Sequence, residues 1–386
     1  MESVRLKLYT FHNIINKEVK VVAFDTSKLK SKFSSKNREK VERPRDVISF
    51  DIGSNTIKIV EGRYSKNKLQ VYRMMDMPTP DGAVEDGRII NERELSEALK
   101  SFLKTNNVKI KEGTCTTNSS SIISREISIP VDIEADEMDT VIEYEVEQFL
   151  PIKLDDYIIQ YTILDKVADT EGPKLKVNVV SFPKVIAKGY FDLLTSLELT
   201  PYVLDVNFNA LNKITSYSQI TMGGTVAFVD MGATSINVTI FNGGKIDFTR
   251  IIKYGGDNID YALSIKLDMS TKSTESEKIE KASLLRINED DILNVTVEES
   301  MSEILGELER ILQFYNNQSA GSTIESLVIY GGTSNIEGID QYMERKLNIP
   351  TKRLGRLKNI EFTTRRQNND ENIGKYLNAL GSIIRL

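Results

Sequence analysis

The sequence predicts an α/β fold of two duplicated lobes, each a mixed sheet with helices. The main indication is a strand–turn–strand pattern that occurs twice, about half a chain apart. The length of 386 residues is enough for two or three packed units. With 40% apolar and 27% charged residues, the composition is that of an ordinary globular protein, which argues against a fibrous or globally disordered chain.

The first copy of the pattern begins with the apolar run at residues 47–50. This run enters the turn 51–56 (DIGSNT), and residues 57–61 continue as a strand. Gly53 lets the backbone approach a ligand closely, and the amides and hydroxyls of such a turn can point at an anion. Asp51, just before the turn, is available to hold Mg²⁺ through water. The segment is a candidate phosphate-binding hairpin.

The second copy has the apolar strand 226–229, the turn 230–235 (DMGATS) and a second strand at 236–241. Asp230 occupies the position that Asp51 has in the first copy. Two such turns, each after an apolar strand, suggest lobes that clasp one polyphosphate between them. Because a single D-x-G turn occurs in many hairpins, the alternative of two plain hairpins stays open from spacing alone.

Three further segments favour a ligand site. The strand 326–330 runs into Gly331-Gly332-Thr333, and residues 336–347 then have helical spacing. The turn 254–257 makes a similar glycine pair before a predicted helix at 258–266. Residues 372–386 are expected to form an amphipathic helix.

Several classes of chemistry are excluded by residue counts. Cys115 is the only cysteine and His12 the only histidine, so intrachain disulfides, Cys or His metal clusters and most Ser/His/Asp or Cys/His catalysis are ruled out. No run approaches the roughly 18 apolar residues that a membrane-spanning helix needs. We therefore expect a cytoplasmic protein whose chemistry uses carboxylates, hydroxyls, amides, lysines and oxygen-ligated Mg²⁺.

Charge is divided unevenly along the chain. Residues 1–46 hold twelve Lys/Arg and six Asp/Glu, so the remainder carries a net charge of −12. An acidic body argues against nucleic acid as a partner. The basic segment 27–45 has the composition of a linker, which is either a solvated spacer or a weak contact with an anionic membrane.

These segments, in this order, resemble the nucleotide-binding motifs of the actin-like ATPase superfamily. Within it the closest resemblance is to the PilM family of type IV pilus assembly proteins, relatives of the division protein FtsA. The similarity runs from about residue 47 to 386 and includes the stretches 80–89, 124–130, 145–151 and 199–206. The resemblance implies the actin-like fold, with a small α+β subdomain inserted into the first lobe.

The implied organisation has five parts. They are a basic extension (1–46), a first lobe (47–83 plus 168–218), an inserted subdomain (84–167), the core of the second lobe (219–257 plus 325–386) and a helical subdomain of that lobe (258–324).

The resemblance also implies ATP and Mg²⁺ as cofactors and assigns the site residues. Those that cradle phosphate are Asp51, Gly53, Ser54, Asn55 and Lys58 in the first lobe, and Asp230, Gly232, Ala233, Thr234 and Ser235 in the second. Gly255, Gly256 and Asp257 are expected near ribose and phosphate, and Gly331, Gly332 and Thr333 near adenosine. Glu277 is the counterpart of a ribose contact in the family's Ala-Glu-x-x-Lys element, although Glu280 stands at the lysine position. Asp51 and Asp230 are the implied metal residues, acting through water.

One departure from the family pattern bears on hydrolysis. Where PilM-like sequences usually read Asp-Val-Glu, this chain has Asp205-Val206-Asn207. An asparagine cannot act as a carboxylate base or carry charge toward Mg²⁺. We therefore predict ATP binding with very slow hydrolysis, the nucleotide acting as a conformational clamp, and assign no catalytic residue.

The implied function is a scaffold at the inner face of the cytoplasmic membrane, reached through partners in the pilus assembly complex. The inserted subdomain is expected to receive the cytoplasmic N-terminal peptide of a PilN-like membrane protein by extended-peptide capture. The segment 4–8 of this chain is an alternative occupant of that groove in cis, and self-association is a further option. A small-molecule kinase of the same superfamily and an FtsA-like division filament are the alternative functions.

Within the inserted subdomain, one helix is predicted from a single apolar stripe. Its members are Met138, Val141, Ile142, Val146, Phe149 and Leu150. Such a stripe is expected to be core, and Glu143 and Glu147 on the opposite face are expected to be solvated.

Overall fold

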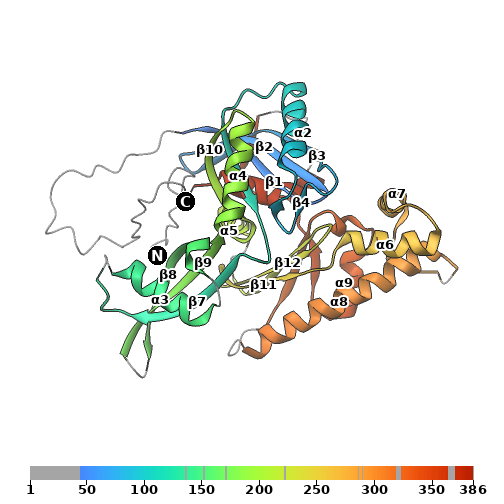
Figure 1. The fold of residues 1–386 in the computed structure, drawn as a ribbon. Helices are drawn as coiled ribbons and strands as arrows, with labels where there is room; N and C mark the ends of the chain where they lie inside the picture. The colour runs from blue at the N-terminus through green and yellow to red at the C-terminus, as the bar shows by residue number, and fades with distance from the viewer. Residues whose placement is uncertain are drawn as a thin grey trace.

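The computed structural model describes residues 44–134, 137–150, 153–169, 172–220, 223–285, 287–288, 290–318, 323–363 and 370–385. Two sheets form the two lobes, and a smaller sheet lies beside the first (Figure 1). The predicted basic extension lies almost wholly outside the described residues, as do the segments 4–8 and most of 27–45.

The first lobe is built on a six-stranded sheet in the order β10-β6-β1-β2-β3-β16. Its strands are β1 (Asp46–Ile52), β2 (Thr56–Ser65), β3 (Lys68–Pro78), β6 (Glu112–Thr117), β10 (Thr200–Val206) and β16 (Ile360–Phe362). β1, β2 and β3 form an antiparallel meander, and β1 pairs in parallel with β6. A short hairpin of β4 (Val84–Glu85) and β5 (Arg88–Ile89) leads to the helix α2 (Glu92–Thr105).

The second lobe repeats this order. Its sheet reads β13-β12-β11-β14-β15, again an antiparallel meander followed by strands parallel to the first one. The strands are β11 (Thr225–Met231), β12 (Ile236–Asn242), β13 (Lys245–Ile252), β14 (Ser326–Tyr330) and β15 (Thr351–Arg353). The predicted duplication is therefore visible in the strand order and not only in the turns.

A separate three-stranded sheet, β7-β9-β8, carries the helix α3 (Met138–Phe149). Its strands are β7 (Ile123–Pro130), β8 (Tyr157–Asp169) and β9 (Gly172–Pro183), and a 3₁₀ turn at Leu154–Asp156 precedes β8. Met138, Ile142 and Val146 are buried against this sheet, while Glu143 and Glu147 are exposed. The prediction of a core stripe and a solvated acidic face is confirmed for these residues.

Helices cover the two large sheets. α4 (Lys184–Ser196) packs against α2 in the first lobe. The second lobe has α6 (Gly256–Leu267), α7 (Thr271–Lys281), α8 (Ile292–Gln318) and α9 (Ile339–Leu347), with a 3₁₀ turn at Thr333–Asn335. In the described part of the chain, no helix combines the length and apolar character needed to cross a bilayer.

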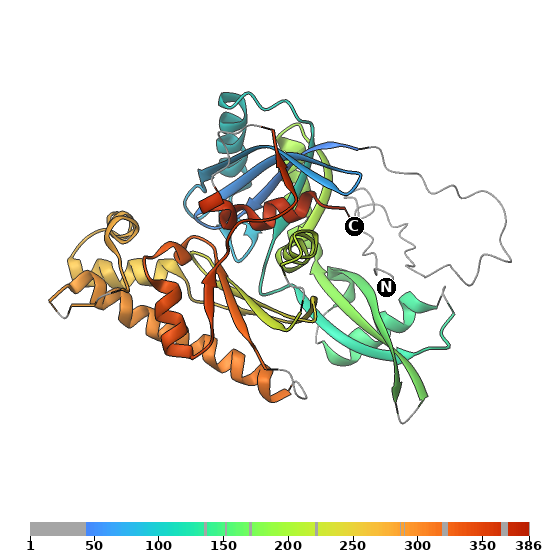
Figure 2. The same ribbon diagram turned by 180° about the vertical axis from the view of Figure 1, so that it is seen from behind.

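Two helices lie between the lobes, α5 (Asn207–Tyr217) and α10 (Leu377–Ile383) (Figure 2). They pack against each other, and α10 also contacts β1, β2 and β6. Their apolar side chains join a core cluster that includes Val60 from the first sheet and Phe228 from the second. Burial of this shared cluster stabilises the contact between the two lobes.

The expected strand–turn–strand segments and the helix near 258–266 are confirmed by the structure. The expected single helix at 372–386 is wrong in detail, because Asp370–Tyr376 is a 3₁₀ segment and the α-helix covers only Leu377–Ile383. The expected amphipathic character is also wrong for α10, because all seven of its residues are buried between the two sheets.

Candidate functional site

The two predicted phosphate hairpins have the same backbone geometry. The N–H of Gly53 donates to the carbonyl of Thr56 over 3.2 Å, and the N–H of Gly232 donates to the carbonyl of Ser235 over 3.1 Å. A Cβ at Gly232 would come within 2.8 Å of that Ser235 oxygen, so the tight turn has no room for a side chain there.

A threonine hydroxyl braces each turn from outside. Thr79 Oγ1 donates to the carbonyl of Gly53 over 2.7 Å, and Thr333 Oγ1 donates to the carbonyl of Gly232 over 3.1 Å. Thr79 follows the third strand of its meander, whereas Thr333 follows β14. The same support therefore comes from different places in the two lobes.

The two turns meet across the gap between the lobes. Ser54 Oγ lies 3.1 Å from Thr234 Oγ1, and Asn55 Nδ2 donates to Asp257 Oδ1 over 3.0 Å. These partners are 180 and 202 residues apart in the chain. The fold thus brings polar groups of both predicted phosphate motifs into one place.

Two aspartates lie at the ends of the hairpins' first strands. Asp51 is 6% exposed and stands opposite Lys58 in the strand register. Burial raises the pKa of the Asp51 carboxyl, and the positive charge of Lys58 opposes that rise. Burial and the nearby charge of Asp51 raise the pKa of Asp230 to about 6. The two carboxylates therefore repel each other, and a cation bound between them would reduce that repulsion.

Asn378, which lies outside both hairpins, is hydrogen-bonded to the aspartate pair. Asn378 on α10 is 4% exposed, and its Nδ2 donates to Asp230 Oδ2 over 3.3 Å. A hydrogen bond from the same side chain also opposes the rise in the pKa of Asp51. Sequence analysis did not select Asn378, although a polar residue among Leu377, Ala379 and Leu380 in an apolar helix was a usable signal.

Asn207 lies two strands away from Asp51. Thr116 on β6 is the register partner of Asp51, and Thr116 Oγ1 donates to Asn207 Oδ1 over 2.8 Å. Asn207 begins α5 immediately after β10, the next strand of the sheet. The carboxamide therefore stands at the same carboxyl edge of the sheet as Asp51.

The junction between β10 and α5 is fixed by a buried ion pair. Lys213 Nζ lies 2.5 Å from Asp205 Oδ2, and it also donates to the carbonyl of Ile384 over 3.2 Å. Burial lowers the pKa of Lys213 to about 8, while the charge of Asp205 opposes this. Since an unpaired buried charge costs several kcal/mol, this contact holds Asn207 in a defined position.

The glycine pairs pack closely around the second hairpin. The N–H groups of Gly256 and Asp257, at the start of α6, donate to the carbonyls of Gly232 and Ala233 over 3.0 and 2.9 Å. Gly331 has a φ of +91°, and a Cβ there would lie 2.6 Å from Asp230 Oδ1. By contrast, a Cβ on Gly332 would meet nothing within 4 Å. The first glycine of the pair is required by packing, and the second faces open space.

On α7 the structure sets two neighbouring residues in different surroundings. Glu277 pairs with Lys281 over 2.6 Å at the surface. Lys278 is buried, donates to Asp260 Oδ2 over 2.6 Å and to the carbonyl of Gly256 over 3.1 Å. Lys278, which was not among the predicted site residues, connects α7 to the glycine pair at the start of α6.

The residues present fit a hydrated Mg²⁺ with a polyphosphate. Within the described ranges, no group of three or more His, Cys, Asp or Glu side chains is arranged to hold a metal ion. Mg²⁺ needs no such cluster, because it is usually held by one or two carboxylates, several waters and the phosphates of its substrate. Asp51 and Asp230 could provide the carboxylates, and Lys58, Ser54 and Thr234 could provide donors for phosphate oxygens.

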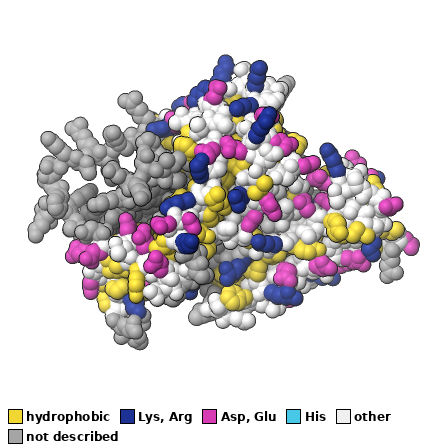
Figure 3. All heavy atoms as spheres, in the orientation of Figure 1, with side chains coloured by type: hydrophobic (Ala, Val, Ile, Leu, Met, Phe, Trp, Pro, Cys, Tyr) yellow, Lys and Arg dark blue, Asp and Glu magenta, His cyan; other side chains and the backbone are white. Residues whose placement is uncertain are grey.

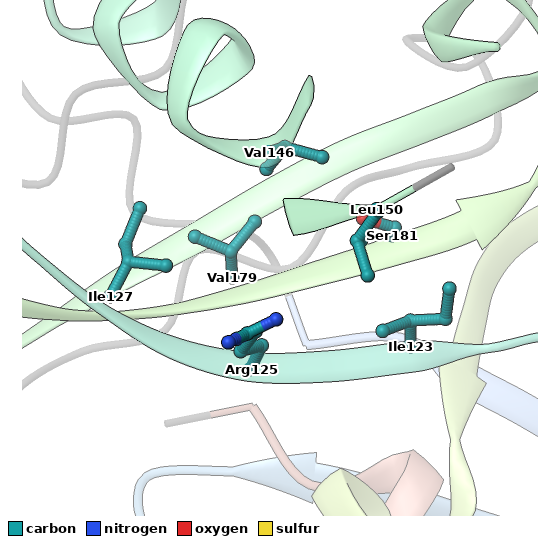
Figure 4. A pocket seen from close by; sticks show the side chains of 7 residues that line it. All are labelled: Ile123, Arg125, Ile127, Val146, Leu150, Val179 and Ser181. Atoms are coloured by element: carbon teal, nitrogen blue, oxygen red, sulfur yellow. The ribbon is translucent and has the colours of Figure 1, made fainter. Parts of the chain in front are cut away.

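A second candidate site lies in the small subdomain. A small cavity is lined by side chains from β7, β9 and α3, namely Ile123, Arg125, Ile127, Val146, Leu150, Val179 and Ser181. Figure 4 shows Val146 entering from the helix above the sheet, while Ile127 and Val179 come from the adjacent strands. The lining is mainly apolar.

The surface around this cavity is acidic. Residues 118–183 contain fourteen Asp/Glu and five Lys/Arg, so the region holds most of the negative charge of the body. Acidic side chains gather over this region in the space-filling view (Figure 3). Asp139, Glu143 and Glu147 form an exposed acidic row along α3, beside the exposed ring of Tyr144.

Comparisons with known proteins match this architecture. The family profile described as "Type IV pilus assembly protein PilM" matches residues 49–386. The cell division protein FtsA of Bacillus subtilis (strain 168) is 22% identical over 334 residues, and the match covers 76% of this chain and 74% of FtsA.

Solved structures agree at the level of the fold. The structure of the PilM-PilN type IV pilus biogenesis complex matches with a TM-score of 0.74 at 18% identity, covering 88% of this chain and 98% of that one. The ethanolamine utilization protein EutJ from Carboxydothermus hydrogenoformans matches with a TM-score of 0.51 at 11% identity, covering 89% and 90%. The predicted two-lobed, actin-like α/β fold is confirmed.

Proposed function

Because the chain belongs to the PilM family of type IV pilus assembly proteins, we propose that it is an assembly scaffold that binds ATP with Mg²⁺ between its hairpins. The observation that carries the nucleotide part is the meeting of the two turns, with Ser54 Oγ 3.1 Å from Thr234 Oγ1. Two tight turns rich in donors, the buried Asp51 and the half-buried Asp230 suit a triphosphate and its cation.

Each residue has a distinct role in this proposal. Lys58, Ser54 and Thr234 bind phosphate oxygens, and Asp51 with Asp230 orients the waters of the cation. Gly331 and Gly332 border the adenosine, since the second of them faces open space. Bound Mg²⁺·ATP supplies a compact array of charges that both hairpins contact at once, which stabilises one relative position of the lobes.

Nucleotide binding is tested by calorimetric titration of the purified chain with ATP, with and without Mg²⁺. We expect saturable binding that Mg²⁺ tightens at least tenfold. Heats that are identical in Mg²⁺ and in a chelator, or no heat in either, would remove the nucleotide part of the proposal.

We propose that hydrolysis is very slow, because Asn207 stands at the carboxyl edge of the sheet where related sequences have glutamate. A carboxamide accepts a hydrogen bond but cannot take a proton from water. Changing Asn207→Glu is expected to raise phosphate release by about 100-fold, the lower range for a general base. Ser216→Glu, at an exposed position near the other end of the same helix, is the control, because it adds a carboxylate away from the carboxyl edge of the sheet. Wild-type turnover near 1 s⁻¹ would contradict the proposal.

The partner we propose is the cytoplasmic N-terminal peptide of a PilN-like inner-membrane protein, captured at the small subdomain. The acidic face of α3 beside this small apolar cavity suits an extended segment with basic flanks that lies along the subdomain. Attachment to such a partner would hold the chain at the cytoplasmic face of the membrane.

Charge reversal tests the partner site. The double change Glu143→Lys with Glu147→Lys is expected to weaken binding of the PilN-like peptide by roughly tenfold and to flatten its salt dependence. Glu309→Lys, on the exposed face of α8, provides a charge change away from the cavity. Equal affinity for all three proteins would refute the acidic recognition of the peptide.

A further inference from the structure

The C-terminal helix contributes a side chain to the aspartate pair. Asn378 lies on α10, whose apolar side chains pack into the core shared by both sheets. Its carboxamide nitrogen donates to Asp230 Oδ2 over 3.3 Å. An element that belongs to neither hairpin thus reaches the centre of the proposed cation site.

The other end of the same carboxamide has no partner among the described residues. Asn378 Oδ1 is buried and accepts no hydrogen bond. An unpaired buried acceptor is unfavourable by about 1–3 kcal/mol, so a position that only needed packing would be better served by leucine. The amide plane keeps Oδ1 close to Nδ2, which places this acceptor beside the aspartates.

We propose that Asn378 is a positioning residue for the cation: Nδ2 holds Asp230, and Oδ1 accepts a hydrogen bond from a water molecule of hydrated Mg²⁺. This inference rests on the proposed binding of Mg²⁺·ATP. Mg²⁺ keeps several of its waters in proteins, and these waters are strong donors that need acceptors in the surrounding shell. A neutral oxygen meets that need without adding a third negative charge next to Asp51 and Asp230.

The test compares two substitutions at the same position. Asn378→Leu keeps the approximate volume and removes both polar atoms. Asn378→Asp keeps oxygen acceptors and removes the donor. For each protein, ATP affinity is measured by titration with Mg²⁺ and in chelator, and the ratio of the two affinities is the readout.

We expect Asn378→Leu to reduce the Mg²⁺-dependent ratio by about tenfold, the lower end for residues that support a metal site. We expect Asn378→Asp to keep or increase the ratio, while its added charge weakens binding in chelator. A residue that only supports the fold would change the ratio in the same direction in both variants, and that result would overturn the inference.

Controls separate this inference from the proposed function. Ser382→Ala changes the same helix at a hydroxyl that bonds Ser49 and the carbonyl of Ala379, and it should leave the ratio unchanged. If the wild-type chain shows no Mg²⁺-dependent binding, the proposed function itself fails. If the wild type binds and Asn378→Leu keeps the full ratio, only the role of Asn378 fails. If Asn378→Leu does not fold, a reduced ratio in Asn378→Asp likewise rejects that role.

Discussion

The two hairpins have the same backbone and different electrostatics. In both, an aspartate ends the first strand and a glycine N–H closes the turn onto the carbonyl three residues later. Opposite Asp51 stands Lys58, whereas opposite Asp230 stands Asn237, whose Oδ1 accepts from Asn118 Nδ2 over 2.6 Å. The first aspartate has a cation as its register partner, and the second has a neutral amide.

This difference shows that a duplicated backbone can carry different side chains at matching positions. Backbone geometry is repeated because a tight turn has few solutions, while side chains at matching positions are free to diverge. Burial raises the pKa of both aspartates; for Asp230 the charge of Asp51 adds to this rise and the charge of Lys58 opposes it, and the pKa reaches about 6.

The aspartates should be equivalent toward the metal despite their different neighbours. Asp51→Asn and Asp230→Asn are each expected to reduce Mg²⁺-dependent tightening of ATP by about 100-fold, which corresponds to about 2.7 kcal/mol. Titration in Mg²⁺ and in chelator provides the measurement. If only one substitution has this effect, one hairpin alone holds the cation and the two aspartates are not equivalent.

β6 and β14, the strands parallel to the first strand of each hairpin, should differ at their carboxyl ends in whether they accept a side chain. The position after the register partner of Asp51 is Thr117, and the matching position after that of Asp230 is Gly331. Gly331→Ala should lower the free energy of unfolding by about 2 kcal/mol, since it adds left-handed strain and crowds Asp230. Gly332→Ala, with φ of −61° and open space, is the control and should be nearly neutral. Equal losses of unfolding free energy for Gly331→Ala and Gly332→Ala, measured in denaturant, would contradict this prediction.

The raised pKa of Asp230 predicts a pH dependence in Mg²⁺-free buffer. The unfolded carboxyl titrates near pH 3.9, so between about pH 4 and 6 the folded state binds more protons than the unfolded state. Stability should therefore fall as pH rises through this window and then level off. The free energy of unfolding of Asp230→Asn, measured in urea and expressed relative to wild type, should rise by about 1–2 kcal/mol between pH 4 and 7. A constant difference across this range would contradict the assigned pKa.

The hydroxyl contact between the turns should contribute least. A double-mutant cycle of Ser54→Ala and Thr234→Ala is expected to give a coupling of about 0.5 kcal/mol, because the contact is partly exposed. Pairing Ser54→Ala with Thr249→Ala on β13 provides the uncoupled control. A coupling above about 2 kcal/mol would mean that the two turns hold the lobes together without ligand.

Local sequence patterns were enough to predict much of the fold and the family. The two Asp-x-Gly turns, the apolar strands before them and the helix after Gly256 were predictable, because turn geometry and hydrophobic period are properties of a few adjacent residues. The predicted family is confirmed by the match over residues 49–386. The assigned site residues, ATP, Mg²⁺ and the domain boundaries stay predictions.

The tertiary structure determines the contacts between residues that are far apart in the chain. Sequence spacing could not show that Ser54 meets Thr234, that Thr333 braces Gly232, or that Asn378 reaches Asp230 from a helix 148 residues away. It could not show that Lys278 is buried and Glu277 is not, because both lie on the same short polar helix. Local pattern sets the elements through short-range sterics and burial, whereas the site is set by how two sheets and the helices between them pack.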